Sequence, residues 1–212
     1  MNDAFKTSQW LGIIVVALSA LTAAGWLFGI EALTSSIIPD TIAMKFITAV
    51  LLVLAGIVLA TMGAAHRHQI DVTPLVVFGC GFIILLLTVT LVYHTVAGGY
   101  DGVSLLVPDE TGAAQTLFPG RPPVVTLVAL LLMCVIAGIG TVWSEKAHPT
   151  IKTIGILITI AGALPVIGYA LGIRALYYGG IAWTNPMPFK EALLLILVGA
   201  GLWLIGRTPH RR

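Results

Sequence analysis

The charged side chains near the starts of hydrophobic segments are the residues best suited to chemistry in this sequence. Lys45, Arg121 and Lys190 each lie close to the start of such a segment, and Glu191 follows Lys190 directly. Cations and helix N-termini attract anions, and a neighbouring carboxylate adds a partner for an ammonium group. We therefore expect a polar mouth that binds a small anionic or zwitterionic ligand. The alternative is that these long side chains only extend to a membrane–water interface.

Two further charges occupy equivalent positions in a short repeated motif. Glu31 follows Gly29-Ile30, and Arg174 follows Gly172-Ile173. We expect both side chains at the same depth, within the same ligand-binding region. If the segments that carry them are neighbours, the opposite charges should also pair, although an exposed pair contributes only about 0–1 kcal/mol. Two independent exposed side chains are the alternative.

The histidines and cysteines do not predict a cofactor site. His94 is the only histidine within a hydrophobic segment, whereas a membrane haem usually takes two such axial ligands. His66 and His68 make an incomplete metal site, and Cys80 and Cys134 have the positions of packing residues inside hydrophobic segments. No nucleophile–base pair or phosphate-binding loop is present. We therefore expect no enzymatic activity, no metal and no cofactor.

The composition identifies the class of protein that must position these charges. The chain has 212 residues, of which 58% are hydrophobic and 9% charged, and its mean hydropathy is +1.02. Soluble domains carry about 25% charged residues. A soluble enzyme, a disordered protein and a nucleic-acid-binding protein are therefore excluded, and the net charge of +2 favours no particular partner. The composition is that of an integral membrane protein.

Six segments are long enough to cross a bilayer as helices, which takes roughly 20 apolar residues. They predict an all-α integral membrane fold in a single domain, residues 1–212. The segments are Trp10–Phe28, Thr41–Gly63, Pro74–Ala97, Pro122–Ser144, Ile151–Ile173 and Pro188–Gly206.

Two recurring motifs predict that these segments form three tandem helical hairpins, residues 10–63, 74–144 and 151–206. The first and fifth segments end in Gly-Ile-x-Ala-Leu. The second, fourth and sixth share an Ala-Gly pair followed by Ile or Leu, at Ala55-Gly56, Ala137-Gly138 and Ala200-Gly201. Two spans per unit return the chain to its starting side, so the repeats are parallel and surround a pseudo-threefold axis near the membrane normal. Chance matches in a Leu-, Ala- and Gly-rich sequence are the alternative.

The longest connection, residues 98–121, carries Asp101, Asp109 and Glu110 and no basic residue before Arg121. Long loops in compact proteins are often binding segments. We expect these acids to contact an extracytoplasmic partner, which would be another membrane protein or a second copy of the chain. A solvated loop is the alternative. Beyond this partner we expect only membrane lipids and no nucleic acid.

The hairpin pattern resembles the six-helix integral membrane domain at the N-terminus of some bacterial sensor histidine kinases and diguanylate cyclases. The similar parts are residues 26–33, Phe118-Pro119-Gly120-Arg121-Pro122, and residues 168–173 with Ala175-Leu176. The resemblance implies a sensory or anchoring domain in the bacterial cytoplasmic (inner) membrane. No kinase, cyclase or PAS-like segment follows, so we expect a non-enzymatic sensory or docking module without its own output domain. A small-solute transporter or channel with an extracytoplasmic polar mouth is the alternative, which the lack of charges at segment centres disfavours.

The distribution of Lys and Arg predicts that both termini are cytoplasmic. Seven of the eleven basic residues lie on the side of the termini and four on the other side. The seven are Lys6, Arg67, Lys146, Lys152, Arg207, Arg211 and Arg212; the four are Lys45, Arg121, Arg174 and Lys190.

A reporter fused after Arg212 tests this topology. We expect green fluorescent protein at that position to fluoresce and alkaline phosphatase to be inactive, because only the former works in the cytoplasm. Active phosphatase at this end would reverse the predicted orientation.

Overall fold

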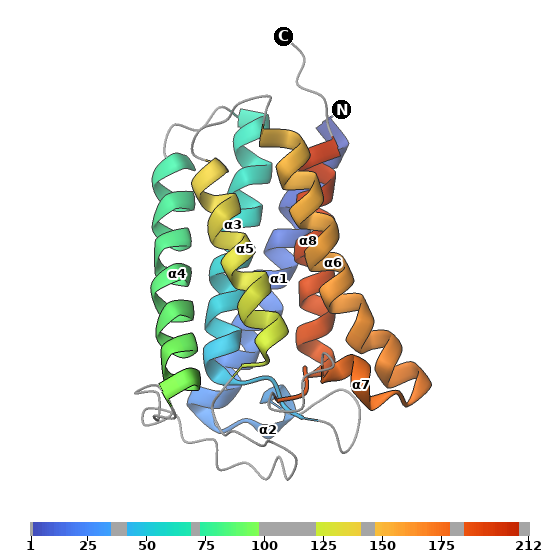
Figure 1. Ribbon diagram of the computed structural model, residues 1–212. Helices are drawn as coiled ribbons and strands as arrows, with labels where there is room; N and C mark the ends of the chain where they lie inside the picture. Colours follow the sequence, from blue (N-terminus) through green and yellow to red (C-terminus); the bar gives the residue numbers. More distant parts are fainter. Residues whose placement is uncertain are drawn as a thin grey trace.

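The computed structural model describes residues 2–34, 42–68, 73–97, 122–140, 147–178 and 185–207. Within these ranges the chain is helical and contains no strand. The helices are α1 (Asn2–Phe28), α2 (Glu31–Thr34), α3 (Phe46–His68), α4 (Thr73–Ala97), α5 (Val124–Gly140), α6 (Ala147–Leu171), α7 (Arg174–Tyr177) and α8 (Phe189–Arg207). Five of them, α1, α3, α4, α6 and α8, are long and apolar enough to cross a membrane. They lie side by side in one bundle, as in a multi-pass membrane protein (Figure 1).

The fourth predicted segment corresponds to α5, which has 17 residues. Its apolar part, Val124–Gly138, is shorter than the roughly 20 residues that span a bilayer core. The remainder of the predicted segment, residues 141–144, lies outside the described residues. Five candidate spans are therefore present in the described part of the chain, and the sixth stays a prediction.

The long helices are arranged as a closed ring of pairs. α1 packs against α3, α4 against α5, and α6 against α8. We call α1, α4 and α6 the outer helices and α3, α5 and α8 the inner helices. Each outer helix also contacts the inner helix of a neighbouring pair: α4 touches α3, α6 touches α5, and α1 touches α8. The contact between α1 and α8 joins the first pair to the last, so the ring closes. α3 contacts both α5 and α8, and these three helices form the interior of the bundle.

The first and last pairs make the same contacts at residues whose numbers differ by 143. A Cβ on Gly12 would lie 2.5 Å from the backbone N of Ala60, and one on Gly155 would lie 2.6 Å from the backbone N of Trp203. Glycines at these positions let the two helix backbones touch, as small residues do in membrane bundles.

The same separation relates Gly56 on α3 to Gly199 on α8, and each faces the outer helix of its own pair. Gly201, which the Ala-Gly motif had aligned with Gly56, faces Leu59 instead. The alignment of that motif was therefore wrong by two residues, whereas the Gly-Ile-x-Ala-Leu motif keeps the separation of 143.

The first backbone hydrogen bond of each inner helix shows which positions on the three helices are equivalent. Ala49 N donates to Lys45 O, Leu127 N to Pro123 O, and Ala192 N to Pro188 O, at 3.0–3.1 Å. In this register Cys134 on α5 matches Gly56 and Gly199. The middle pair therefore has a cysteine side chain where the other two pairs have a glycine. α4 and α5 also contact each other less extensively than the helices of the other two pairs do.

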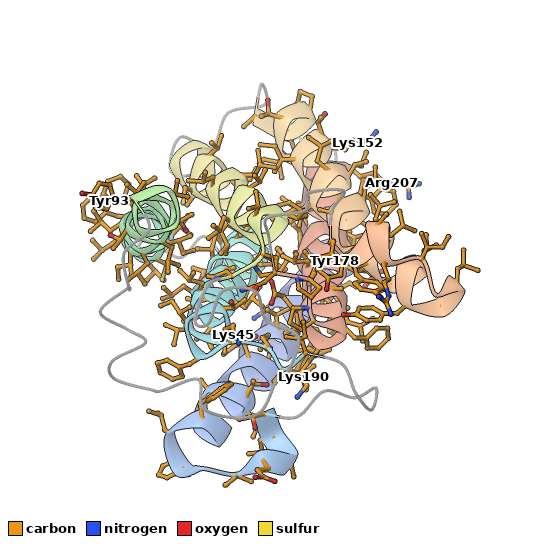
Figure 2. The ribbon with its side chains drawn as sticks, turned by 60° about the horizontal axis from the view of Figure 1, so that its bottom comes forward. Lys45, Tyr93, Lys152, Tyr178, Lys190 and Arg207 are labelled. Atoms are coloured by element: carbon orange, nitrogen blue, oxygen red, sulfur yellow. The ribbon has the colours of Figure 1, made fainter. Side chains whose placement is uncertain are left out.

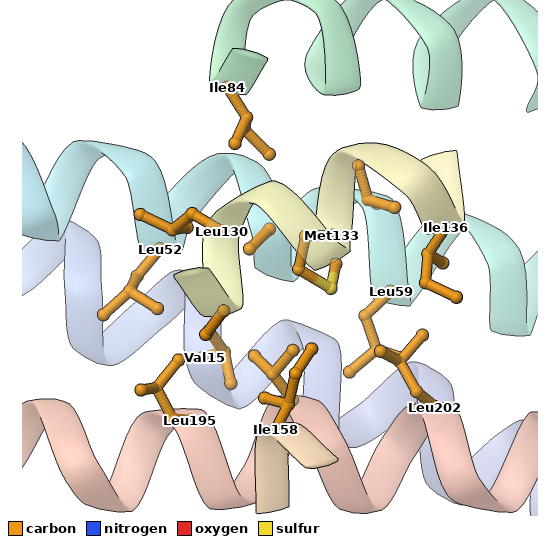
Figure 3. Close-up of a cluster of buried hydrophobic side chains, with 14 of the residues drawn as sticks. Val15, Leu52, Leu59, Ile84, Leu130, Met133, Ile136, Ile158, Leu195 and Leu202 are labelled. Atoms are coloured by element: carbon orange, nitrogen blue, oxygen red, sulfur yellow. The ribbon is translucent and has the colours of Figure 1, made fainter. Parts of the chain in front are cut away.

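The same register places Leu52, Leu130 and Leu195 in one buried layer between the inner helices (Figure 3). Val15 on α1 and Ile158 on α6, two residues separated by 143, are also fully buried in this core. Apolar side chains of the inner helices thus fill the centre of the bundle.

Two short helices, α2 and α7, lie at the same end of the bundle (Figure 1). We call it the α2/α7 end. Each follows a glycine with a left-handed backbone, Gly29 (φ 66°) or Gly172 (φ 70°), a conformation that glycine adopts without strain. Ile30 N donates to Gly25 O and Ile173 N to Gly168 O, at 2.8 and 2.9 Å, so both turns close the preceding helix in the same way. These short helices are the structure of the Gly-Ile-x-Ala-Leu motif.

The glycine contacts predict which small residues tolerate substitution. In Gly199→Ala the new Cβ would lie 2.5 Å from the backbone N of Thr159, so α6 and α8 must separate. We expect a loss of about 1–3 kcal/mol in the free energy of unfolding, measured on the purified protein in detergent.

Gly79→Ala is the matched control, because nothing lies within 4 Å of a Cβ at that position. Alanine favours helix over glycine by about 1 kcal/mol, so this variant should be as stable as the wild type or more so. Equal destabilisation by the two substitutions would contradict the proposed backbone contact.

Candidate functional site

Three buried polar side chains meet at the α2/α7 end of the inner helices, and we call them the polar cluster: Lys45, Thr126 and Glu191. Thr126 Oγ1 donates a hydrogen bond to Glu191 Oε1. Lys45 attracts the same carboxylate electrostatically. The Glu191 side chain is 0% exposed and that of Lys45 is 3% exposed. Each residue comes from a different helix pair, so the polar cluster connects all three.

The local structure at the starts of the inner helices explains this convergence. Thr126 and Glu191 each lie three residues after a proline whose carbonyl accepts the first hydrogen bond of the helix, and Thr48 lies three residues after Lys45. Thr48, Thr126 and Glu191 are therefore equivalent residues in the first turns of α3, α5 and α8. All three are fully buried.

Lys190 makes a separate link at the same end. Its Nζ donates to the carbonyl O of Leu33 in α2 at 2.9 Å, and the side chain is half-buried. The bond joins the start of α8 to the short helix that follows α1. Figure 2 looks onto this end and shows Lys45 and Lys190, two cations that the structure brings there from different pairs.

Aromatic side chains fix the backbone segments that precede α3 and α8. Trp26 Nε1 donates to Met44 O at 2.9 Å, and Tyr169 Oη donates to Met187 O at 2.8 Å. These pairs again differ by 143 residues. The Tyr169 ring also stacks on Tyr177 of α7, with centroids 4.5 Å apart and planes 6° apart. Residues just before the inner helices, including Lys45, are thereby held against the outer helices.

The electrostatics of the polar cluster are unusual for an apolar bundle. Removing a charged group from water costs several kcal/mol, and only a good partner offsets this cost. Glu191 has one hydrogen bond, from Thr126, and the attraction of Lys45; its Oε2 atom has no hydrogen-bond partner among the described residues. Ionisable groups retained in such surroundings mark functional sites by default.

The structure brings together part of the site predicted from the sequence. Lys45, Lys190 and Glu191 lie at one end of the bundle, as their positions at segment starts predicted. Arg121 lies outside the described residues, as do the loop acids Asp101, Asp109 and Glu110.

Glu31 and Arg174 begin α2 and α7, and both side chains are exposed. Neither belongs to the polar cluster, and no ion pair joins them in the described structure. The predicted pairing of these two charges was therefore wrong. The closed ring explains this, because matched positions of two pairs are related by rotation about the bundle and need not be adjacent.

Thr126 and Thr48 are functional candidates that the sequence does not reveal, because their hydroxyls carry no charge that would distinguish them in an apolar segment. Their signal is positional: each lies three residues after the residue that starts an inner helix. Of the other candidates, Cys80 and Cys134 are free and partly buried, and Cys134 Sγ donates to Leu130 O of its own helix. Across the described residues, no group of three His, Cys, Asp or Glu is placed to hold a metal ion.

No protein-family model matches this chain, and no curated protein or solved structure shows significant similarity to it.

The polar cluster predicts how stability depends on Lys45. In Lys45→Met a side chain of similar length loses its charge and leaves the Glu191 carboxylate buried with a single hydrogen bond. We expect a loss of up to about 3–5 kcal/mol in the free energy of unfolding. Adding Glu191→Gln to the variant removes the uncompensated charge and should restore most of the loss.

Lys152→Met is the control, since Lys152 is exposed on α6 and should change stability little. If Lys45→Met unfolds at the same temperature as this control, the two buried charges are not coupled.

Proposed function

We propose that this protein is a non-enzymatic sensory or docking module of the bacterial cytoplasmic (inner) membrane. It binds a small ligand or a partner membrane protein at its extracytoplasmic end. The polar cluster is the observation that carries this proposal, because buried charges are costly in an apolar bundle and here they join all three helix pairs. By the resemblance noted above, the module is a stand-alone relative of the six-helix membrane domain at the N-terminus of some sensor histidine kinases and diguanylate cyclases.

The proposed topology has six spans as three tandem hairpins about a pseudo-threefold axis, with both termini cytoplasmic. The ring of helix contacts supports it, as does the repetition of contacts at a separation of 143 residues. From Gly12 to Gly63 the paired residues include identical glycines at five positions: 12, 25, 29, 56 and 63 match 155, 168, 172, 199 and 206. With cytoplasmic termini, the α2/α7 end faces the extracytoplasmic side.

The proposed ligand region is that end of the bundle. Lys190 and Lys45 supply positive charge, Arg121 precedes α5 in the sequence, and three helix N-termini point the same way. Glu191 balances one of these cations from within the bundle. Glu31 and Arg174 are exposed at the same end, and they would contact a larger ligand. This arrangement favours a small anionic or zwitterionic molecule.

The proposed contact with a partner involves Asp101, Asp109 and Glu110, which the sequence places between α4 and α5 on the extracytoplasmic side. The partner is a membrane protein or a second copy of the chain. No cofactor, metal or nucleic acid enters this function.

A small-solute transporter or channel is the alternative function. The buried leucine layer of Leu52, Leu130 and Leu195 weighs against a permeation path along the axis, because apolar side chains fill it. Transport would need the helix pairs to separate.

Site-specific crosslinking in intact cells tests the proposed function. A photoreactive residue at Asp109 should give one discrete adduct with a membrane protein or with a second copy. Replacing Asp101 and Glu110 by Asn and Gln should abolish it. The same photoreactive residue at Leu164, an exposed apolar position on α6, is the control and should give no discrete protein adduct.

Two results would contradict the proposal. One is an identical adduct pattern from positions 109 and 164. The other is solute uptake by proteoliposomes that Lys45→Met abolishes, which would establish the transporter instead.

A further inference from the structure

Two cations lie side by side at the end of the bundle opposite the α2/α7 end, where α6 begins and α8 ends (Figure 1). We call Lys152 of α6 and Arg207 of α8 the basic pair. Their backbones are adjacent, because a Cβ on Gly206 would lie 2.7 Å from Lys152 Cα and Arg207 is the next residue. Both side chains are exposed, and Figure 2 shows them on the same side of the bundle, pointing away from its core.

The Trp203 ring positions one member of the basic pair. Arg207 Cζ lies 5.1 Å from the centroid of this ring, within the range of a cation–π interaction. Trp203 is fixed in turn by its close packing on α6, where a Cβ on Gly155 would lie 2.6 Å from the Trp203 backbone N. Tryptophan is enriched where the headgroup region of a bilayer begins. The ring thus indicates that the basic pair lies at the depth of phospholipid headgroups.

The first helix pair lacks these three side chains, although its backbones are arranged in the same way. A Cβ on Gly63 would lie 3.0 Å from Gln9 Cα, which matches the contact of Gly206 with Lys152. The equivalent residues at the separation of 143 are Gln9 and Lys152, Ala60 and Trp203, and Ala64 and Arg207. Equivalent packing therefore needs neither the cations nor the indole ring, and their presence together in one pair points to a role other than packing.

The local charge at the basic pair is positive. In the described part of the chain, neither cation forms an ion pair with a carboxylate. Among the described residues the one acid at this end, Asp3, lies on α1, one turn before Lys6. The N-terminus of α6 and the C-terminus of α8 lie together here, so their opposite partial charges offset each other. The two side chains therefore set the local charge, which favours an anion.

An exposed apolar row continues from the basic pair along α6. Ile156, Ile160 and Leu164 follow Lys152 at intervals of four residues, which places all four on one side of the helix. The three apolar side chains are exposed. A soluble anion would contact only the two cations, whereas a phospholipid matches both features, with its phosphate at the cations and an acyl chain along the apolar row.

We propose that the basic pair binds the headgroup of an anionic phospholipid of the phosphatidylglycerol type. Lys152 Nζ and the Arg207 guanidinium group donate hydrogen bonds to the phosphate oxygens. Phosphatidylcholine is disfavoured, because its quaternary ammonium group is repelled by the same cations. The site lies at the opposite end of the bundle from the polar cluster, and it does not depend on the proposed sensory function.

Competition between two lipids tests this preference. The full-length protein in a non-ionic detergent is mixed with phosphatidylglycerol and phosphatidylcholine of identical acyl chains, and native mass spectrometry measures the ratio of the two bound lipids. The wild type should favour phosphatidylglycerol. Lys152→Gln and Arg207→Ala introduce the residues of the first pair. Each should lower the ratio about 5-fold, and the double variant about 25-fold, since each cation near a membrane surface attracts anionic lipid to this extent.

Lys6→Gln is the matched control, because it removes an exposed cation at the same end from a helix that also carries Asp3. It should change the ratio by no more than about 2-fold. In lipid-free detergent all these variants should melt close to the wild-type temperature, since exposed charges contribute little to stability. A lower ratio then reports weaker lipid binding and not unfolding.

Three results would overturn the inference. The first is an equal lipid ratio in the wild type and the double variant. The second is an equal loss in Lys6→Gln and Lys152→Gln, because net charge alone would then account for the preference. The third is retention of glycerol phosphate, which has no acyl chains, as tightly as phosphatidylglycerol, because the site would then bind a soluble phosphate.

Discussion

The direct contact between helix backbones at glycine is the constraint on which the rest of the structure depends. At Gly12 and Gly155 there is no room for even a methyl group, so each outer helix is held at a fixed distance and register against its inner partner. That register sets the height at which each inner helix begins. Thr48 and Glu191 reach the same level of the bundle because their helices are positioned by equivalent glycine contacts. The position of the polar cluster therefore depends on the glycine contacts, which the inner helices make on the face turned towards their outer partners.

The aromatic contacts transmit this register to the segments before the inner helices. Trp26 and Tyr169 belong to outer helices, and each bonds the carbonyl that lies four residues before a first-turn position of α3 or α8. Those carbonyls are thus engaged by the neighbouring helix and not by side chains of their own helix. The glycine contacts thus fix the outer helices, the aromatic hydrogen bonds fix the segments before α3 and α8, and these segments position the polar cluster at the centre of the bundle.

The sequence predicted the helical membrane architecture well, because long apolar segments have few other solutions. It also predicted that Lys45, Lys190 and Glu191 lie at one end, since depth follows from position within a segment. It did not predict which residues share a face. Gly201 was aligned with Gly56 on local similarity alone, whereas packing selects Gly199. The pair of Glu31 with Arg174 failed for a related reason, because equal depth says nothing about distance around a ring. The sequence does not indicate a role for Thr126, because a hydroxyl carries no sign of burial.

The replacement of glycine by Cys134 in the middle pair has a mechanical consequence. Two sectors of the ring are held by contacts between backbones, which cannot yield without unwinding a helix. In the third, the close approach is between Gly81 of α4 and the methyl group of Ala137 in α5, so a side chain stands between the two backbones. α4 and α5 are therefore held less directly than the other two pairs, and we expect a stress on the ring to separate them first.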